Sequence, residues 1–281
     1  MSQAPGGLTE PWLVALDVDG TVLHEDETLS PAVVAAVRQA SAAGHEVTLA
    51  TGRSWSTARG VLDALQLRPE YVVCANGAVI MRQDPDMAAS PDGYRRELVE
   101  TFDPAPVLKL IRDGVPGGRF MVEDAQGQRY YTEGMGEWNL IGAKRVDLDE
   151  MARIRVTRVV CVSPEHSTDD FLELVSALGL HQVSYSVGYT AWLDVAPTGV
   201  NKATAIERVR DWMGVPRDRV LAAGDGRNDL ELLSWAGEHG RAVAMGQAPE
   251  DVRAVATEVT HAVTEDGLVP VLHSLPGVRA S

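Results

Sequence analysis

Short apolar runs alternate with longer stretches of helical spacing along the first third of the chain. Three apolar runs are typical of buried strands: residues 12–18 (WLVALDV), 46–50 and 71–75. Two amphipathic stretches lie between them, at 31–43 and 55–65. Ser30 is the expected N-cap of the first helix, with Pro31 at its first position. Strands that alternate with helices predict βαβ units, so the pattern favours an α/β fold with a parallel sheet.

The same alternation returns towards the end of the chain. Its strands are expected at 192–196, 219–223 and 241–245, and its helices at 201–213 and 229–235. Residues 83–94 (QDPDMAASPDGY) are rich in Pro, Asp, Ser and Gly, which is typical of a connection between domains. From about 94 to 190, strand-like runs outnumber the two or three helices, one of which is expected at 168–178. We therefore predict a discontinuous core of residues 1–83 and 191–281, interrupted by an α+β domain at 84–190.

The composition and the net charge limit the kinds of molecule that this protein is expected to bind. The chain has 281 residues, of which 45% are hydrophobic and 23% charged. This balance, at this length, is that of a globular protein of about two domains. The formal net charge of −15 repels nucleic-acid phosphates and anionic lipid, so we expect neither as a partner.

The sequence also indicates a compartment. It begins without a secretory signal and has no run near the roughly 20 apolar residues of a membrane helix, so we expect a cytoplasmic protein. Cys74 and Cys161 each lie in an apolar stretch and are expected to be buried thiols in a reducing compartment. The sequence has neither a CxxC pair nor an HExxH motif, so no zinc site of these kinds is expected.

Two aspartates follow the first predicted strand, at the end where open α/β sheets bind their ligands. Asp17 and Asp19 are two residues apart, so both would face the same side if the strand continued. Carboxylates this close together raise the pKa of one of them or bind a cation, and their oxygens suit Mg²⁺. An EF-hand is excluded, because a loop that begins at Asp17 has Val22 and Thr28 where Gly and Glu are required.

A second acidic motif, residues 224–229 (GDGRND), follows the apolar run RVLAA. If the two strands are neighbours, Asp225 and Asp229 converge on Asp17 and Asp19. Four carboxylates in one crevice require a divalent cation. The first motif by itself is equally compatible with an ordinary Asp-Gly turn, and the presence of both motifs disfavours that alternative.

Two further segments offer partners for an anion. Thr51, Gly52 and Arg53 follow the second strand, although a Thr before Gly is also a common helix cap. Lys202 lies in the first turn of a predicted helix, where the helix dipole disfavours a cation. We therefore expect Lys202 to face an anion, with a solvated surface lysine as the alternative.

These segments occur in the order of a known set of motifs. The sequences LDVDGT, ATGR, GVNKATAI and GDGRND resemble the four motifs of the haloacid dehalogenase (HAD) superfamily. The pattern is most similar to the Cof-like phosphatase branch, in which a large α/β cap is inserted between the second and third motifs. That is where residues 84–190 fall. The resemblance implies a Rossmann-like parallel-sheet core with an inserted α+β cap. It covers the whole core and is much weaker over the cap.

The resemblance also implies catalytic roles for the aspartates. Asp17 would be the nucleophile that forms an aspartyl-phosphate, and Asp19 the general acid and base. Mg²⁺ would be bound by an oxygen of Asp17, the backbone carbonyl of Asp19 and Asp225. Asp229 would lie behind these ligands or act through a water molecule.

A second group of residues would bind the phosphate. Thr51, the Gly52 N–H and Lys202 would bind the transferring phosphoryl oxygens, and Asn228 would orient phosphate or metal ligands. Asn76, in CANGA, is expected to border the substrate. The cap would select the substrate, and its candidates are Arg119, Tyr130, Tyr131, Trp138 and Trp192, although aromatic residues at strand spacing more often belong to a core.

The resemblance implies a phosphatase that acts on a small phosphorylated metabolite, and a sugar phosphate is the expected class of substrate. Phosphomutases of the superfamily keep both aspartates, so the motifs do not separate hydrolysis from mutase chemistry. A phosphorylatable regulator of the receiver type is disfavoured by Asp19 and the large insertion. A sensor without turnover is disfavoured because every expected catalytic residue is present. The sequence leaves open whether the protein is a monomer or a homodimer.

Overall fold

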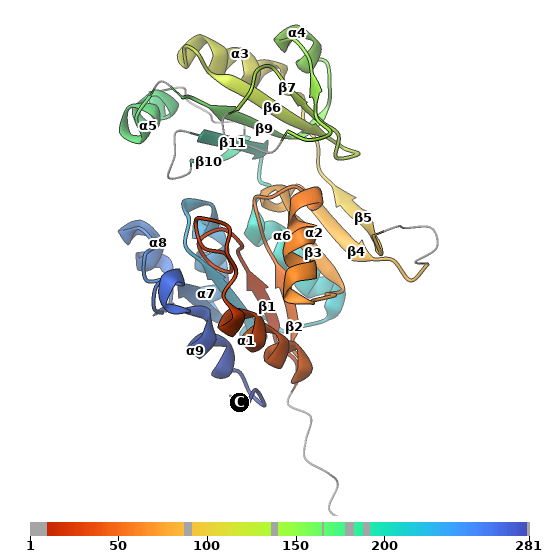
Figure 1. Ribbon diagram of the computed structural model, residues 1–281, viewed down its shortest axis with the longest axis vertical. Helices are drawn as coiled ribbons and strands as arrows, with labels where there is room; N and C mark the ends of the chain where they lie inside the picture. The colour runs from red at the N-terminus through yellow and green to blue at the C-terminus, as the bar shows by residue number, and fades with distance from the viewer. Residues whose placement is uncertain are drawn as a thin grey trace, which may run out of the picture.

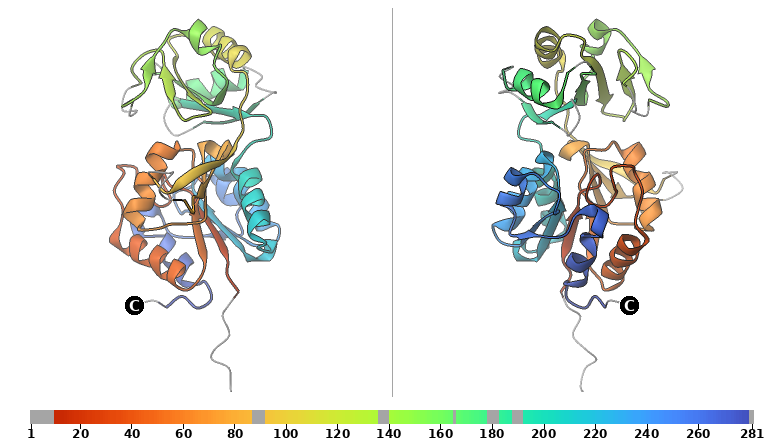
Figure 2. Two further views of the ribbon diagram at one scale, coloured as in Figure 1. Left: turned by 90° about the vertical axis from the view of Figure 1, so that its right-hand side faces the viewer. Right: turned by 60° about the vertical axis from the view of Figure 1, so that its left-hand side comes forward.

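The computed structural model describes residues 10–86, 92–135, 140–164, 166–177, 183–187 and 192–279. The described residues form two parts, one above the other in Figure 1. The upper part comprises described residues between 102 and 197, and the lower part contains both ends of the described chain (Figures 1 and 2).

A five-stranded parallel sheet lies at the centre of the lower part. Its order is β14-β13-β12-β1-β2. The strands are β1 (Leu13–Leu16), β2 (Glu46–Leu49), β12 (Val220–Gly224), β13 (Arg241–Ala244) and β14 (Glu258–Val259). The first and twelfth strands are neighbours in register from Leu13 opposite Val220 to Leu16 opposite Ala223. Their carboxyl ends, where the two acidic motifs begin, therefore lie side by side.

Helices cover both faces of this sheet. They are α1 (Pro31–Ala42), α2 (Trp55–Leu65), α6 (Lys202–Met213), α7 (Leu230–Gly237), α8 (Glu250–Val255) and α9 (Leu268–His273). Alternate side chains of β1 enter different cores, as the period of two requires: Val14 and Leu16 pack with α1, α2 and α9, whereas Leu13 and Ala15 pack with α6, α7 and α8. Ser30 caps α1, because its side chain accepts the Ala32 N–H.

Beyond β2, the chain continues in an antiparallel sheet of β3 (Tyr71–Cys74), β4 (Val79–Gln83) and β5 (Tyr94–Val99). A bridge between Ala50 and Val73 joins it to the parallel sheet. The short helix η1 (Ala75–Gly77) connects β3 to β4, and Asn76 within it has a φ of 51°. The other short 3-10 helices are η2 (Arg217–Arg219), η3 (Arg227–Asp229) and η4 (Val263–Glu265).

The upper part contains a six-stranded mixed sheet, which we call the cap sheet, in the order β10-β11-β9-β6-β7-β8. Its strands are β6 (Arg119–Asp124), β7 (Arg129–Tyr131), β8 (Lys144–Arg145), β9 (Val156–Val162), β10 (Val183–Val187) and β11 (Trp192–Pro197). Its helices are α3 (Ala105–Gly114), α4 (Leu148–Met151) and α5 (Thr168–Ala177). One face of the sheet packs with these helices through residues such as Val122, Val159 and Val195. Residues of the other face contact the lower part.

The predicted fold class, a parallel-sheet α/β core with an α+β insertion, is confirmed. Strand pairing differs from expectation at the two edges of the predicted insertion. Residues 94–99 pair with β4 in the lower part, and residues 192–197 pair with β9 and β10 in the cap sheet. Local sequence does not reveal which sheet a strand joins. We therefore propose the division into two domains with these two strands reassigned.

None of the helices that the structure describes is both long enough and apolar enough to cross a membrane.

Candidate active site

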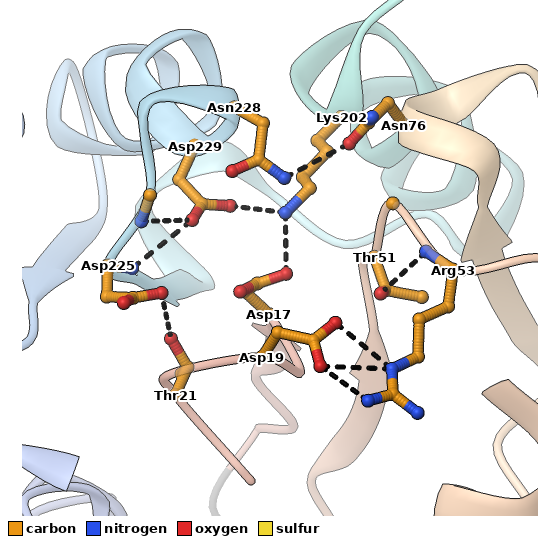
Figure 3. Close-up of polar contacts among 12 residues, drawn as sticks. Asp17, Asp19, Thr21, Thr51, Arg53, Asn76, Lys202, Asp225, Asn228 and Asp229 are labelled. Atoms are coloured by element: carbon orange, nitrogen blue, oxygen red, sulfur yellow. Dashed lines mark hydrogen bonds and ion pairs between the residues drawn. The ribbon is translucent and has the colours of Figure 1, made fainter. Parts of the chain in front are cut away.

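The carboxyl ends of β1 and β12 bring the two acidic motifs together (Figure 3). Asp17 follows directly after β1, and its N–H donates to the Ala223 carbonyl of the neighbouring strand. Asp225 follows β12, and Asp229 ends η3. Carboxylate oxygens of these three residues all lie within 4.8 Å of one another. Asp17 and Asp225 are each only 4% exposed and Asp229 is fully buried, so three acids share one desolvated site.

Lys202 is the cation at the centre of this cluster. It begins α6, whose capping residue is Asn201, and its side chain is fully buried. Its Nζ donates to Asp17 Oδ1 and to Asp229 Oδ1, both at 2.6 Å. The alternative of a solvated surface lysine is therefore wrong, because the ammonium group faces two carboxylates.

Both carboxylate oxygens of Asp229 accept hydrogen bonds from the protein. Its Oδ1 accepts from Lys202, and its Oδ2 accepts the backbone N–H groups of Asp225 and Gly226 at 3.2 and 3.0 Å. Asp17 differs, because no residue that the structure describes donates a hydrogen bond to its Oδ2. Asp229 is thus fixed through both of its carboxylate oxygens, whereas Asp17 is fixed through one.

Burial and mutual repulsion shift the acid–base properties of the cluster. Burial raises the pKa of Asp17 well above its ordinary value and Asp229 raises it further, while Lys202 opposes the shift. Burial and then Asp229 raise the pKa of Asp225 to about 7. Burial by itself would lower the pKa of Lys202, but Asp17 and Asp229 outweigh it and raise that pKa.

The charge of this cluster fits a divalent cation. Three carboxylates and one ammonium leave two negative charges uncompensated in a buried site, which is costly without a counter-ion. The donors are hard oxygens, the ligands that Mg²⁺ prefers. The three carboxylates of Asp17, Asp225 and Asp229 therefore fit a bound divalent cation such as Mg²⁺.

Two residues that the sequence analysis did not single out orient Asp225. Thr21 Oγ1 donates to its Oδ1 at 3.4 Å, and Gln247 Nε2 donates to its Oδ2 at 3.2 Å. Gln247 Nε2 also donates to the Gly20 carbonyl at 2.6 Å. Gly20 has a φ of +75°, and a Cβ there would lie 2.1 Å from Asp225 Oδ2. Only glycine thus allows the loop after β1 to pass this close to the carboxylate.

The expectation that Asp19 joins the other three carboxylates is wrong. β1 ends at Leu16, so the alternation on which that expectation depended does not continue. The Asp19 side chain is 59% exposed and pairs with Arg53, whose Nη2 lies 2.5 Å from Asp19 Oδ1. The same Arg53 Nη2 contacts Glu27 at 2.8 Å. Asp19 is therefore held beside the cluster, at its solvent side, by the arginine of the second motif.

Thr51 lies across the site from Asp225 and Asp229 (Figure 3), and Gly52 follows it in the chain. Thr51 is buried, and its hydroxyl oxygen accepts the Arg53 N–H at 3.0 Å. It caps no helix with its side chain, because the N-cap of α2 is Ser54.

Asn76 and Asn228 join the two sides of the site. Asn228 Nδ2 donates to Asn76 Oδ1 at 3.2 Å. Gly52 packs against the same side chain, since a Cβ there would lie 3.1 Å from Asn76 Oδ1. All the residues expected to bind phosphate therefore border one site.

The cap candidates divide between the two faces of the cap sheet. Tyr130 packs with the helix-facing core, and its hydroxyl donates to Asp124. Tyr131 packs on the opposite face with Met121 and Val160, and Arg119 donates to the Gly134 carbonyl. Trp192 is partly buried in β11. Trp138 lies outside the described residues.

A family model of haloacid dehalogenase-like hydrolases matches residues 14–105 and 115–272 of this chain. The chain is 27% identical over 272 residues to 5-amino-6-(5-phospho-D-ribitylamino)uracil phosphatase YitU of Bacillus subtilis (strain 168), covering 94% of this chain and 97% of that protein. It is also 27% identical over 281 residues to pyridoxal phosphate phosphatase YbhA of Escherichia coli (strain K12), covering 93% and 97%.

The fold resembles a solved haloacid dehalogenase-like hydrolase from B. subtilis with a TM-score of 0.76, at 22% identity over 94% of this chain and 99% of that chain. The likeness thus extends over both the core and the insertion. Since the family model matches most of the chain, this protein belongs to the haloacid dehalogenase-like hydrolases and is a phosphoric monoester hydrolase of the Cof-like type.

Proposed function

We propose that this protein hydrolyses a small organic phosphate monoester, in a Mg²⁺-dependent reaction that passes through an aspartyl-phosphate on Asp17. The observation that carries the proposal is the asymmetry of the Asp17 carboxylate. Lys202 donates to Oδ1, while Oδ2 accepts no hydrogen bond from the described residues, and this carboxylate belongs to the acidic cluster. A carboxylate fixed at one oxygen and available at the other suits in-line attack on phosphorus.

The proposed reaction has two steps. In the first, Asp17 Oδ2 forms a bond to phosphorus, the bond to the ester oxygen breaks, and Asp19 gives that oxygen a proton. In the second, Asp19 takes a proton from a water molecule whose oxygen attacks phosphorus, which releases phosphate and restores the Asp17 carboxylate. Asp19 suits proton exchange with substrate and water because its side chain is 59% exposed.

The other residues bind and orient the phosphoryl group in this proposal. Lys202, the Thr51 hydroxyl and the Gly52 N–H would bind its oxygens, with Asn228 and Asn76 at its border. Asp225 would be a metal ligand together with Asp17 and the Asp19 backbone carbonyl, and Asp229 would orient them. A bound Mg²⁺ supplies the positive charge that makes crowded carboxylates and a phosphoryl dianion compatible.

We propose a phosphorylated sugar or a sugar-like metabolite as the substrate, and the cytoplasm as the compartment. Two relatives act on small phosphate esters, of which one carries its phosphate on a ribityl chain, as their names state. Cys74 and Cys161 are both buried and free, which accords with a reducing compartment.

The test is phosphate release from a panel of phosphorylated sugars, nucleotides and cofactors, with Mg²⁺ or with a chelator. Wild-type protein should release phosphate only with the metal. Asp17→Asn should lose turnover by at least about a thousandfold while remaining folded, because it removes the nucleophile at nearly constant volume. Asp211→Asn, the same change at an exposed position on α6, is the matched control. Undiminished turnover by Asp17→Asn contradicts the mechanism, and an isomeric phosphate ester in place of free phosphate identifies a mutase.

A further inference from the structure

Three buried charged residues of the cap sheet have no role in the steps above. Glu123 on β6, Arg158 on β9 and Asp194 on β11 are 1%, 4% and 3% exposed. Glu123 and Arg158 are direct cross-strand partners. Buried charges are costly unless they are paired and hydrogen-bonded. Their partners include the loop that follows β2.

The loop Thr51–Arg53 has three backbone carbonyls, and each has a different donor. The Thr51 carbonyl accepts the Asn76 N–H at 3.0 Å, and the Arg53 carbonyl accepts the Ala75 N–H at 2.9 Å. Both donors belong to the core. The Gly52 carbonyl accepts from Arg158 Nη1 at 2.5 Å. The third carbonyl of the phosphate-binding loop is thus held by a side chain of the cap sheet.

This contact acts on the Thr51 hydroxyl through one peptide unit. The Gly52 carbonyl and the Arg53 N–H belong to the same planar group, so fixing one fixes the direction of the other. The Arg53 N–H donates to Thr51 Oγ1 at 3.0 Å. Because that oxygen accepts a hydrogen bond from the backbone, its own hydrogen is available to donate to a phosphoryl oxygen.

Asp194 fixes the Arg158 guanidinium and reaches the opposite side of the same site. Arg158 donates to Asp194 through Nε at 3.1 Å and through Nη2 at 2.7 Å. Asp194 Oδ2 also accepts from Asn76 Nδ2 at 2.6 Å, and Asn76 Oδ1 then accepts from Asn228. The planar guanidinium group of an arginine has five N–H donors, so it can bind a carboxylate and a carbonyl at once. The ammonium group of a lysine cannot do so with the same geometry.

A second contact joins the cap sheet to Ser54, the residue that follows this loop. Ser54 Oγ donates to Glu123. Positions 52 and 54 of the core are therefore bound by the adjacent Arg158 and Glu123 of the cap sheet.

We propose that Arg158, oriented by Asp194, is the positioning residue through which the inserted domain sets the phosphate-binding loop. Thr51 and Asn76 then adopt their phosphate-binding geometry only while the cap sheet rests on the core. Docking of the cap over a substrate therefore also completes the site for the phosphoryl group. This inference rests on the proposed phosphatase function.

The experiment compares Arg158→Met, Arg158→Lys and the double variant Arg158→Met/Asp194→Leu with wild type. Arg145→Met is the matched control, because Arg145 is an exposed cap-sheet arginine whose Nε donates to the Thr132 carbonyl within the cap. The readouts are thermal unfolding, kcat and KM on the best ester, and the binding of inorganic phosphate, which is measured by the rise in melting temperature that phosphate causes. The double variant removes both buried charges, so it should recover much of the stability that the single variant loses.

Arg158→Met should lower kcat by about 10- to 100-fold, since small displacements of a phosphate site have effects of this size, and KM should change less. Phosphate binding should weaken about tenfold. Arg158→Lys should be intermediate, and the double variant should regain melting temperature without regaining kcat or phosphate binding. The inference is overturned if the double variant recovers activity together with stability, or if Arg158→Met behaves like Arg145→Met.

Failure of the proposed function gives a different result. Wild-type protein that binds phosphate but hydrolyses no ester contradicts the phosphatase proposal, and the phosphate shift of Arg158→Met against wild type still tests the positioning role. Wild-type protein that neither binds phosphate nor hydrolyses an ester refutes both.

Discussion

Without a divalent cation, the stability of this protein should fall as the pH rises from about 4 to about 7. The ordinary pKa of an aspartate is 3.8, and burial beside Asp229 raises that of Asp225 to about 7. Between these values the folded protein holds a proton that the unfolded chain has lost. Linkage then requires the free energy of unfolding to decrease with pH, because the native state binds more protons.

The size of the effect follows from the width of this window. One proton contributes about 1.4 kcal/mol per pH unit, so roughly three units amount to about 4 kcal/mol for Asp225. Asp17 has a raised pKa for the same first reason, burial, and acts in the same direction. A bound cation replaces the proton as counter-charge. Saturating Mg²⁺ should therefore flatten the decline and should stabilise the protein more at pH 7.5 than at pH 5.

The assay is urea unfolding across this pH range, with a chelator or with saturating Mg²⁺. Exposed carboxylates with lowered pKa values, such as Asp251 and Glu258, contribute the opposite slope, so the measured quantity is the difference between wild type and Asp225→Asn. The metal-free wild type should decline more steeply than this variant, and the variant should gain little from Mg²⁺. Equal slopes, or an equal gain from the metal at pH 5 and pH 7.5, refute the reasoning.

Three further substitutions test the site. Asp19→Asn should slow both half-reactions, and phosphoenzyme should accumulate if the second half-reaction is slowed more. Acid quenching traps this aspartyl-phosphate, which is stable in acid and labile in base. Unchanged kinetics would exclude the acid–base role of Asp19. Gly20→Ala should abolish the Mg²⁺-induced rise in melting temperature, since its Cβ would lie 2.1 Å from an Asp225 oxygen, and an intact rise contradicts this geometry. Lys202→Met should destabilise the metal-free protein by about 3 kcal/mol at pH 7, because it leaves the buried carboxylates of Asp17 and Asp229 unpaired. The loss should be smaller at pH 5, where more of these carboxylates are protonated. Urea unfolding measures both losses, and equal losses at the two pH values would contradict this prediction.

Local sequence was sufficient for the elements and the polar motifs of the core. The helix at 55–65 has the bounds that periodicity predicts, and Ser30 and Pro31 start α1 as their capping chemistry requires. Such features depend on side-chain spacing and turn chemistry within a few residues, so they can be predicted without the tertiary structure.

Which strands pair with one another could not be predicted from local sequence. Residues 94–99 and 192–197 each look like an ordinary strand, and the sheet that each joins depends on which unpaired edge the folded chain places beside it. The position of the Asp19 side chain likewise depends on where β1 ends and on the reach of Arg53.

The sequence by itself determined the α/β class, the order of the motifs and the residue types that crowd negative charge into one crevice. Only the tertiary structure decided how that crevice is held together. Gln247 lies 22 residues from Asp225, and Arg158 lies 106 residues from Gly52. No local pattern marks either residue, because a hydrogen bond between distant segments depends on the packing of whole layers. The contacts that orient the acidic ligands and the phosphate-binding loop thus exist only in the folded protein.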